Sequence, residues 1–448
     1  MLALVAQRQS PDTPKELPRH QGMDTNSKND EQKRLASRAF MPYPEVVLPS
    51  AVGGPLAGLS FAVKDLFDVE AYPTSGGQPM VLAMSGLKTQ SSPVVSQLLE
   101  AGARFVGKTI TDELAFSING QNAHFGDPVN PRAPDRISGG SSSGSASAVA
   151  HGLCDIGIGS DPGGSIRAPA SHCGLIGMRT SHGLVSLKNS LEFAPSLDTC
   201  GWFASDMDTF TKASSVLLQA PRCLAPMMPA IVKPRWMLGS DWWSMLNPEV
   251  ELAHGFAMRG ILAGLQAGSH RLTAFSIDFD ALGPEISGFD DLVLAFRMIQ
   301  AYEAWQCHGA MIQTYGLSLG PGVAERFHWA SQVTAADYRK ASKLRDVFTQ
   351  WFDEQLGHDG LMIVPTMPDI APLRSADSGS LDQYRAAAMR MLCVAGLCRL
   401  PQISLPLSER LGAPLGLSLI GPAGSDLALL PWAMFLMQSG TRPDCAVP

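Results

Sequence analysis

The chain has 448 residues, of which 17% are charged and 45% hydrophobic, and its 41 acidic and 34 basic residues give a net charge of -7. So few charges on so long a chain indicate a large domain with much interior, because the buried fraction of a protein rises with its size. A pI near 5.8 argues against a nucleic-acid-binding protein. The chain also has no run of about 18 apolar residues, so no membrane span is expected.

The first 35 residues are expected to form a disordered tail, followed by one large domain over residues 36–448. Met1–Ala6 lacks the basic flank of a secretory signal, and Gln7–Gln32 holds little that a core could bury. Eight cysteines without an export signal are typical of reduced thiols, so we expect a cytoplasmic protein. Adjacent pairs such as His172–Cys173 lack the spacing that zinc prefers, so no metal site is expected.

Short apolar strands alternate with helices along the domain. Ser92-Pro93 predicts a helix start, and Gly102 predicts its end. Strands are expected over 59–63, 104–107, 155–159, 361–364 and 403–405, and a helix of small residues over 146–150. This alternation predicts an α/β fold with a mixed central sheet and helices on both faces.

Two motifs match well-known patterns without the structural context that those patterns require. Gly102–Thr109 satisfies the phosphate-loop pattern GxxxxGK[ST], but here a strand lies between the two glycines where the loop should be. Gly140–Gly144 matches the GxSxG nucleophile elbow, but the proline-rich segment before it does not suit a central strand. We therefore reject nucleotide binding and keep the hydrolase elbow only as a minor alternative.

Glycines and hydroxyl residues are concentrated between Ser138 and Arg167. A flexible linker could have this composition, but an apolar helix and a strand follow without a break. Gly163-Gly164-Ser165 places a hydroxyl beside two residues whose backbone can approach a substrate closely. Consecutive amides at this point could stabilise an oxyanion.

At these residues the chain resembles the amidase signature hydrolases, over about residues 56–430. The family's two glycine–serine runs are matched by GGSSSGS at 139–145 and GGSIR at 163–167, and its lysine-bearing strand end is matched by Ala62–Asp65. Three further stretches also resemble the family: 107–109 together with 112–115, 130–131, and 365–366. The agreement of several motifs in order and spacing makes the resemblance specific.

The resemblance implies a Ser–cis-Ser–Lys triad formed by Ser165, Ser141 and Lys64. An amide carbonyl is a poor electrophile, so its hydrolysis through an acyl-enzyme needs an activated hydroxyl. Neither motif block contains a histidine suited to that task, and a lysine kept neutral by burial could act as the base. Ser142 stays open as the relay in place of its neighbour Ser141.

The backbone amides of Gly163, Gly164 and Ser165 are the expected oxyanion donors. The family usually has a free N–H at the preceding position, where this chain has Pro162, which has none. Asp161 and Arg167 flank the nucleophile and are expected to form an ion pair that braces the loop, since arginine does not act as a base.

Within the family, the chain most resembles plant-type indole-3-acetamide hydrolases and the amidase-like domain of a chloroplast import receptor. This resemblance implies hydrolysis of a small aryl or arylalkyl carboxamide, such as indole-3-acetamide, without a cofactor, and it leaves a homodimer open. The aromatic residues expected to line the substrate pocket are Phe125, Trp202, Phe203, Tyr302 and Trp305. The alternatives are a glutaminase-type subunit of a tRNA-dependent amidotransferase and a catalytically silent interaction module.

Overall fold

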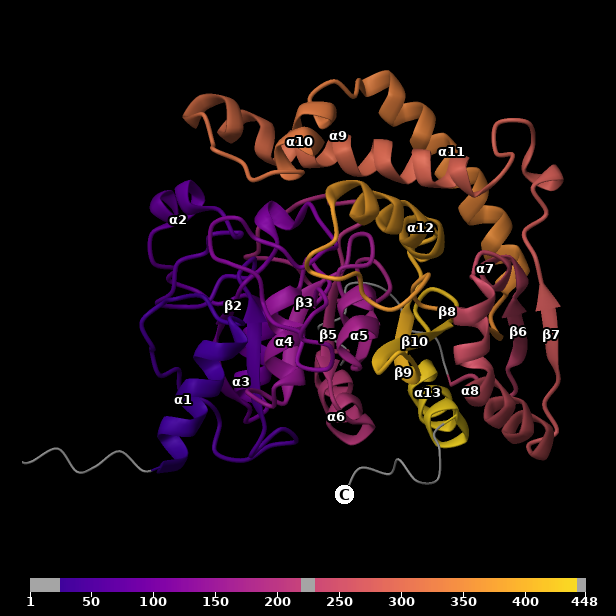
Figure 1. Ribbon diagram of the computed structural model, residues 1–448, viewed down its shortest axis with the longest axis horizontal. Coiled ribbons are helices and arrows are strands. Elements are labelled where there is room, and N and C mark those ends of the chain that lie inside the picture. Colours follow the sequence, from indigo (N-terminus) through magenta and orange to yellow (C-terminus); the bar gives the residue numbers. More distant parts are fainter. Residues whose placement is uncertain (1–24, 219–229, 441–448) are drawn as a thin grey trace, which may run out of the picture.

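The computed structural model describes residues 25–218 and 230–440 and has a ten-stranded mixed sheet as its centre, with strand order β2-β1-β3-β5-β4-β9-β10-β8-β6-β7 (Figure 1). The strands are β1 (Ser60–Lys64), β2 (Arg104–Thr109), β3 (Ile156–Ser160), β4 (Ile176–Arg179), β5 (Cys200–Ala204), β6 (Arg235–Gly239), β7 (Leu272–Phe275), β8 (Gly360–Pro365), β9 (Gln402–Arg410) and β10 (Ala413–Ile420). β1 runs parallel to β2 and β3, and β6 runs parallel to β7 and β8. The pairs between these two groups are antiparallel.

Helices connect and cover the strands. Those of the described residues are α1 (Thr25–Ser37), α2 (Pro79–Ser85), α3 (Pro93–Glu100), α4 (Ser143–Ala150), α5 (Arg167–Cys173), α6 (Met207–Leu217), α7 (Ser240–Ser244), α8 (Pro248–Ala267), α9 (Phe289–Tyr315), α10 (Val323–Ala330), α11 (Ala335–Leu356), α12 (Ser378–Leu397) and α13 (Asp426–Gly440). Two short 3-10 helices are η1 (Glu113–Ala115) and η2 (Asp280–Leu282). The expected α/β fold with a mixed central sheet is confirmed.

Alternate residues of the first strands enter two different cores, one on each face of the sheet. On β1, Phe61 and Val63 belong to the main core, which also contains residues of α3 and α6. Ala62 points to the other face and packs with residues of α4 and α5. On β3, a side chain at Gly157 would overlap the backbone of α4, so glycine there allows the helix to lie close against the sheet.

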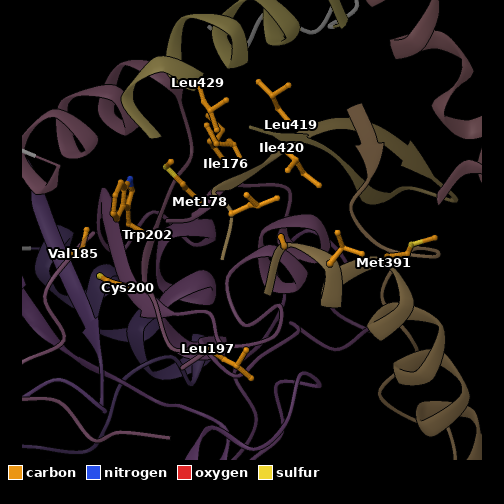
Figure 2. Close-up of a cluster of buried hydrophobic side chains, with 14 of the residues drawn as sticks. Ile176, Met178, Val185, Leu197, Cys200, Trp202, Met391, Leu419, Ile420 and Leu429 are labelled. Atoms are coloured by element: carbon orange, nitrogen blue, oxygen red, sulfur yellow. The ribbon is translucent and has the colours of Figure 1, made fainter. Parts of the chain in front are cut away.

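The main core is continuous across the middle of the sheet. Figure 2 shows side chains of β4, β5 and β10 together with Leu429 of α13 and Met391 of α12. Trp202 lies in this cluster, paired in register with Met178 on the neighbouring strand, and is fully buried. Burial on both faces produces continuous apolar strands, which matches the short apolar runs in the sequence.

The region from Gly102 to Thr109 has the order helix, glycine, strand that the sequence predicts. α3 begins at Pro93 after the N-cap Ser92 and ends at Glu100, and β2 begins at Arg104. Lys108, the lysine of the apparent phosphate loop, is fully buried, and its Nζ lies 2.6 Å from Asp65 Oδ1. Its charge is therefore already paired within the fold, which supports the rejection of nucleotide binding.

A layer of helices lies across one end of the sheet, at the top of Figure 1. α9 contacts α10, α11 and α12, and we call this group of four helices the cap. The loop between α9 and α10 is tied to the rest of the domain, because the Gly320 amide donates to Glu113 Oε2 at 2.8 Å and Gln78 Nε2 donates to the Ser318 carbonyl at 3.2 Å.

The prediction of a disordered tail over residues 1–35 is wrong for its last residues, from 25 onward. Residues 25–37 form α1, and Arg34 of this helix donates to the Val106 carbonyl at 3.0 Å and lies 3.7 Å above the Phe40 ring. The polar composition of this segment concealed the helix, because a few long-range contacts rather than an apolar face hold it. The rest of the expected tail, residues 1–24, lies outside the described residues.

Candidate active site

Lys64, Ser141 and Ser165 lie together although they are far apart in the sequence. Lys64 ends β1, Ser141 precedes α4 and Ser165 precedes α5. Lys64 Nζ donates to Ser141 Oγ at 2.7 Å, and Ser141 Oγ donates to Ser165 Oγ at 3.0 Å. Lys64 Nζ also donates to Ser160 Oγ at 3.0 Å. A buried amine is thus linked through one hydroxyl to a second hydroxyl.

Glycines allow the loops of the two serines to approach their neighbours. Gly164 has φ +120°, which side chains rarely adopt, and an added Cβ would lie 2.5 Å from Leu392 Cδ1 of α12. A Cβ at Gly140 would overlap the Asp112 carboxylate. The peptide bond between Gly140 and Ser141 is cis. The glycine-rich composition is therefore a packing requirement of this site.

Of the two adjacent serines, Ser141 rather than Ser142 contacts both Lys64 and Ser165. Ser142 Oγ instead donates to the Ser160 carbonyl at 3.2 Å and accepts from the Ser160 amide at 3.3 Å. It therefore joins the segment before α4 to the end of β3. This geometry favours Ser141 as the relay, the position that the family pattern indicated.

Burial lowers the pKa of Lys64 to about 7, although the carboxylates of Asp112, Asp198 and Asp161 act in the opposite direction. The side chain is fully buried, and removal from water disfavours its charged form. A substantial fraction of Lys64 is consequently neutral at neutral pH. A neutral amine beside a hydroxyl can accept a proton.

Asp112 is a buried acid beside this amine that the sequence did not single out. Its backbone amide donates to the Ser141 carbonyl at 3.1 Å, and its Oδ2 accepts from the Gly120 amide at 2.9 Å. Burial raises its pKa, and the nearby Lys64 lowers it. Asp112 therefore positions the backbone of Ser141 and adds negative potential at Lys64.

The expected ion pair between Asp161 and Arg167 is present and fully buried. Arg167 Nη2 lies 2.9 Å from Asp161 Oδ1, and its Nε donates to Oδ2 at 3.0 Å. A second buried arginine, Arg179 on β4, lies 3.5 Å from the same carboxylate, and the sequence did not reveal it. The two guanidinium groups hold the pKa of Asp161 well below its usual range. The carboxylate also accepts from the amides of Ile166 and Arg167, so it braces the turn after Ser165.

One of the three predicted oxyanion donors is wrong, because the same carboxylate already accepts its hydrogen bond. The Gly164 amide donates to Asp161 Oδ1 at 2.5 Å and is therefore not available to a substrate. No hydrogen-bond acceptor within residues 25–218 and 230–440 contacts the amides of Gly163 and Ser165. Two of the three predicted donors are left for an oxyanion, and the third stabilises the loop.

Ser165 lines a cavity of about 330 Å³. The cavity is bounded by the loop that carries Ser165, by η1 and the segment after it, and by the cap helices α9, α10 and α12. Its lining residues are Ala115, Phe116, Ser117, Ile118, Pro162, Gly163, Ser165, Val293, Arg297, Gln300, Arg326, Trp329, Asp382, Arg385, Ala386 and Met389. The volume is at the lower end of the usual range for ligand pockets, about 300–1,000 Å³, which suits a small substrate.

None of the five predicted pocket aromatics lines this cavity, so that prediction is wrong. Trp202 and Phe203 are fully buried on opposite faces of β5, one in each core. Tyr302 stacks on Tyr338 with ring centroids 4.6 Å apart. Trp305 packs against the main core, and Phe125 belongs to a turn capped by Asn122. Strand alternation buries the rings of Trp202 and Phe203, while the half-buried Phe125, Tyr302 and Trp305 lie outside the lining of the cavity.

The aromatic residues that do line the cavity are Phe116 and Trp329. α9 reaches the cavity through Val293, Arg297 and Gln300, which lie four and three residues apart and therefore on one face of the helix. This spacing was visible in the sequence. Which face of the helix meets the substrate depends on how the cap docks.

Two general features of the described residues bear on the site. No cluster of three or more His, Cys, Asp or Glu residues in these parts of the chain could hold a metal ion. None of their helices combines the length and the apolar character needed to cross a bilayer.

The chain is similar to known proteins in both sequence and fold. Residues 25–225 match the family model described as Amidase. Amidase 1 of Arabidopsis thaliana is 36% identical over 393 residues, which span 84% of this chain and 91% of that protein. The chloroplastic outer envelope protein 64 of the same plant is 31% identical over 87% of this chain and 68% of its own length. A crystal structure of an amidase superposes with a TM-score of 0.76 at 26% identity, covering 92% of this chain and 94% of that one.

Proposed function

The chain belongs to the amidase family and is an enzyme acting on carbon–nitrogen amide bonds, and we propose that it hydrolyses small aryl or arylalkyl carboxamides to a carboxylic acid and ammonia. The observation that carries this proposal is the buried series Lys64–Ser141–Ser165, which ends at a hydroxyl in the wall of a cavity. In this proposal Ser165 is the nucleophile, Ser141 the relay and Lys64 the base.

Acylation begins with neutral Lys64. Two hydroxyls and a neutral amine can each donate or accept, so rotation of the O–H bonds reverses the hydrogen bonds of the series. Ser165 Oγ attacks the amide carbonyl while its proton passes to Ser141 Oγ and the Ser141 proton passes to Lys64 Nζ. A Lys64 pKa of about 7 suits this step, because a base acts best when its pKa lies near the working pH.

The tetrahedral intermediate then collapses to an acyl-enzyme. The carbon–nitrogen bond breaks, and the leaving nitrogen takes a proton from Ser141, which takes one in turn from Lys64. Water attacks the Ser165 ester by the same relay, and the acid leaves with Ser165 and neutral Lys64 restored. The serine ester divides one difficult hydrolysis into two easier steps.

The amides of Gly163 and Ser165 are the proposed donors to the oxyanion. Both lie in the wall of the cavity, where their dipoles are already oriented before the reaction. Pro162 removes one further donor, and the Gly164 amide is engaged by Asp161. We expect two backbone donors to stabilise the intermediate.

The residues that line the cavity support the proposal of an aryl or arylalkyl acyl group in the substrate. Apolar surface in the same cavity as Ser165 comes from Phe116, Ile118, Val293, Trp329 and Met389. Flat rings pack against such aromatic walls, and the small volume favours a compact acyl group. Indole-3-acetamide and phenylacetamide are the candidate substrates.

The test is ammonia release from indole-3-acetamide, phenylacetamide, benzamide, a short alkyl amide, an anilide and glutamine. Wild type is compared with Ser165→Ala and Ser142→Ala. Activity lost with Ser165→Ala and retained in Ser142→Ala supports the proposal. Activity that depends on Ser142 contradicts it, as does activity on glutamine alone or activity unaffected by Ser165→Ala.

A further inference from the structure

The cap lines the cavity with more positive than negative charge. Three arginines contribute, one from each of three helices: Arg297 on α9, Arg326 on α10 and Arg385 on α12. Asp382 is the single acidic residue among the lining residues. The wall therefore carries an excess of two positive charges beside a nucleophile whose substrate need not be charged at the amide itself.

Arg326 is half-buried in the wall of the cavity. Its Nε is buried without a hydrogen-bond partner, and no carboxylate of the described residues lies within ion-pair distance of its guanidinium. The ring of Phe116 lies beside it, with its centroid 5.7 Å from Cζ. Burial lowers its pKa to about 10, and the charge of Arg385 acts in the same direction, while the carboxylates of Asp112, Asp382 and Glu325 act in the opposite one. A buried N–H without a hydrogen-bond partner is costly unless a ligand supplies the missing acceptor.

The other two arginines lie within electrostatic reach. Arg385 Nη2 forms a long ion pair of 3.4 Å with Asp382, whose side chain is 67% exposed, and the positive charge of Arg297 lowers the pKa of Arg385. The Arg297 guanidinium lies 4.9 Å above the Trp329 ring and has no ion-pair partner among the described residues. Asp382 is screened by water, so it neutralises the group only weakly.

We propose that the acyl group of the substrate carries a carboxylate, which Arg326 binds with the support of Arg385 and Arg297. This inference rests on the proposed function and specifies its substrate class as the primary monoamide of a dicarboxylic acid with an aryl or arylalkyl spacer. The spacer packs on Phe116 and Trp329, while the carboxylate fills the guanidinium cluster. Guanidinium and carboxylate form paired, charge-assisted hydrogen bonds, which give orientation as well as affinity.

The experiment compares phenylacetamide with its 4-carboxy derivative, which differ by one anionic group. We expect kcat/KM for the carboxylated amide to exceed that for phenylacetamide by about 10-fold or more, the usual contribution of hydrogen bonds to a charged group. Arg326→Gln should reduce this ratio by about 10-fold, and Arg385→Gln and Arg297→Gln should reduce it by smaller factors. Arg339→Gln, on the exposed surface of α11, is the matched control with the same loss of charge and should leave the ratio unchanged.

The Arg297→Gln variant and one further measurement keep the test informative if Arg326→Gln does not fold. Arg297 is exposed, so its substitution should not disturb the core. In wild type, raising the ionic strength should increase KM for the carboxylated amide and leave KM for phenylacetamide unchanged, because salt screens the attraction.

The proposal is overturned if phenylacetamide is the better substrate, or if the ratio is the same in wild type, Arg326→Gln and Arg297→Gln. In either case hydrolysis of phenylacetamide that depends on Ser165 would leave the proposed function intact. Hydrolysis of neither compound nor of any other amide in the panel, or hydrolysis unaffected by Ser165→Ala, would instead overturn the proposed function itself.

Discussion

The two walls of the cavity are built in opposite ways. The wall that carries Ser165 comes from residues between β1 and β5, where Lys64, Ser141 and Ser165 are buried and linked by hydrogen bonds of 2.7 and 3.0 Å. The facing wall comes from the cap, where the lining residues Arg297 and Asp382 are exposed and Trp329 is half-buried. One wall is a buried hydrogen-bonded network, and the other is a set of partly exposed side chains on helices.

This difference separates the reaction from the choice of substrate. Proton transfer between three side chains needs positions held within fractions of an ångström, which close packing against glycine-rich loops provides. Selection of an acyl group needs shape and charge, which individual side chains on helix surfaces can supply or change without disturbing the network. Substitutions in the first wall should therefore abolish turnover, and those in the second should alter preference.

The largest expected effect is that of Ser165→Ala. Removal of the nucleophile should lower kcat by about 10³-fold or more, because no acyl-enzyme forms. Ammonia release under saturating phenylacetamide measures this loss, and an unchanged melting temperature is the control for folding. A variant with near-wild-type turnover would show that the first wall does not carry the chemistry.

Ser141→Ala and Lys64→Met should follow, with losses of about 10²–10⁴-fold in kcat through removal of the relay and the base. Ser142→Ala removes only the hydrogen bonds to Ser160 and should cost about 1 kcal/mol in the free energy of unfolding. Urea denaturation and steady-state kinetics on the same samples separate the two effects. Equal catalytic losses at positions 141 and 142 would contradict the assignment of the relay.

The pH dependence should expose the neutral state of Lys64. Its pKa is lowered to about 7 in the folded protein, so the base is protonated and inactive below that pH. We expect kcat/KM to fall about 10-fold for each pH unit below 7 and to level off above it. Initial rates between pH 5 and 9, with an amide that does not itself titrate, measure the profile. Constant activity down to pH 5 would refute Lys64 as the base.

The smallest effects on turnover are expected from substitution of two tryptophans, one in the cavity and one in the core. Trp329→Ala removes an aromatic surface of the cavity and should raise KM for aryl amides by about 10-fold, with little change in kcat. Trp202→Ala should instead cost about 3–5 kcal/mol of unfolding free energy, because the ring is fully buried in the main core. Thermal unfolding and kinetics of both variants distinguish the roles, and a substrate-specific effect at Trp202 alone would restore the original pocket prediction.

Local patterns predicted the elements that carry the proposed triad well. The strand that ends at Lys64, the helix that begins at Pro93 and the serine and glycine runs before α4 and α5 all lie where the sequence placed them. These features depend on neighbours in the chain: an apolar run, a proline at the first helical position, and glycines where backbone approaches backbone. The predicted pocket failed because burial of an aromatic ring depends on which face of its element meets the core.

The amino-acid sequence by itself predicted the α/β fold, and its resemblance to the amidase signature hydrolases pointed to Lys64, Ser141 and Ser165. Each of these residues belongs to a short local motif, and the glycines of the two serine motifs allow close backbone approach. Only the tertiary structure decided which serine faces Lys64, that Asp161 engages the Gly164 amide, and that Arg326, Arg385 and Arg297 line the same cavity. These contacts join elements from β1 to α12, so they arise from helix docking and desolvation, which no local pattern in the sequence encodes.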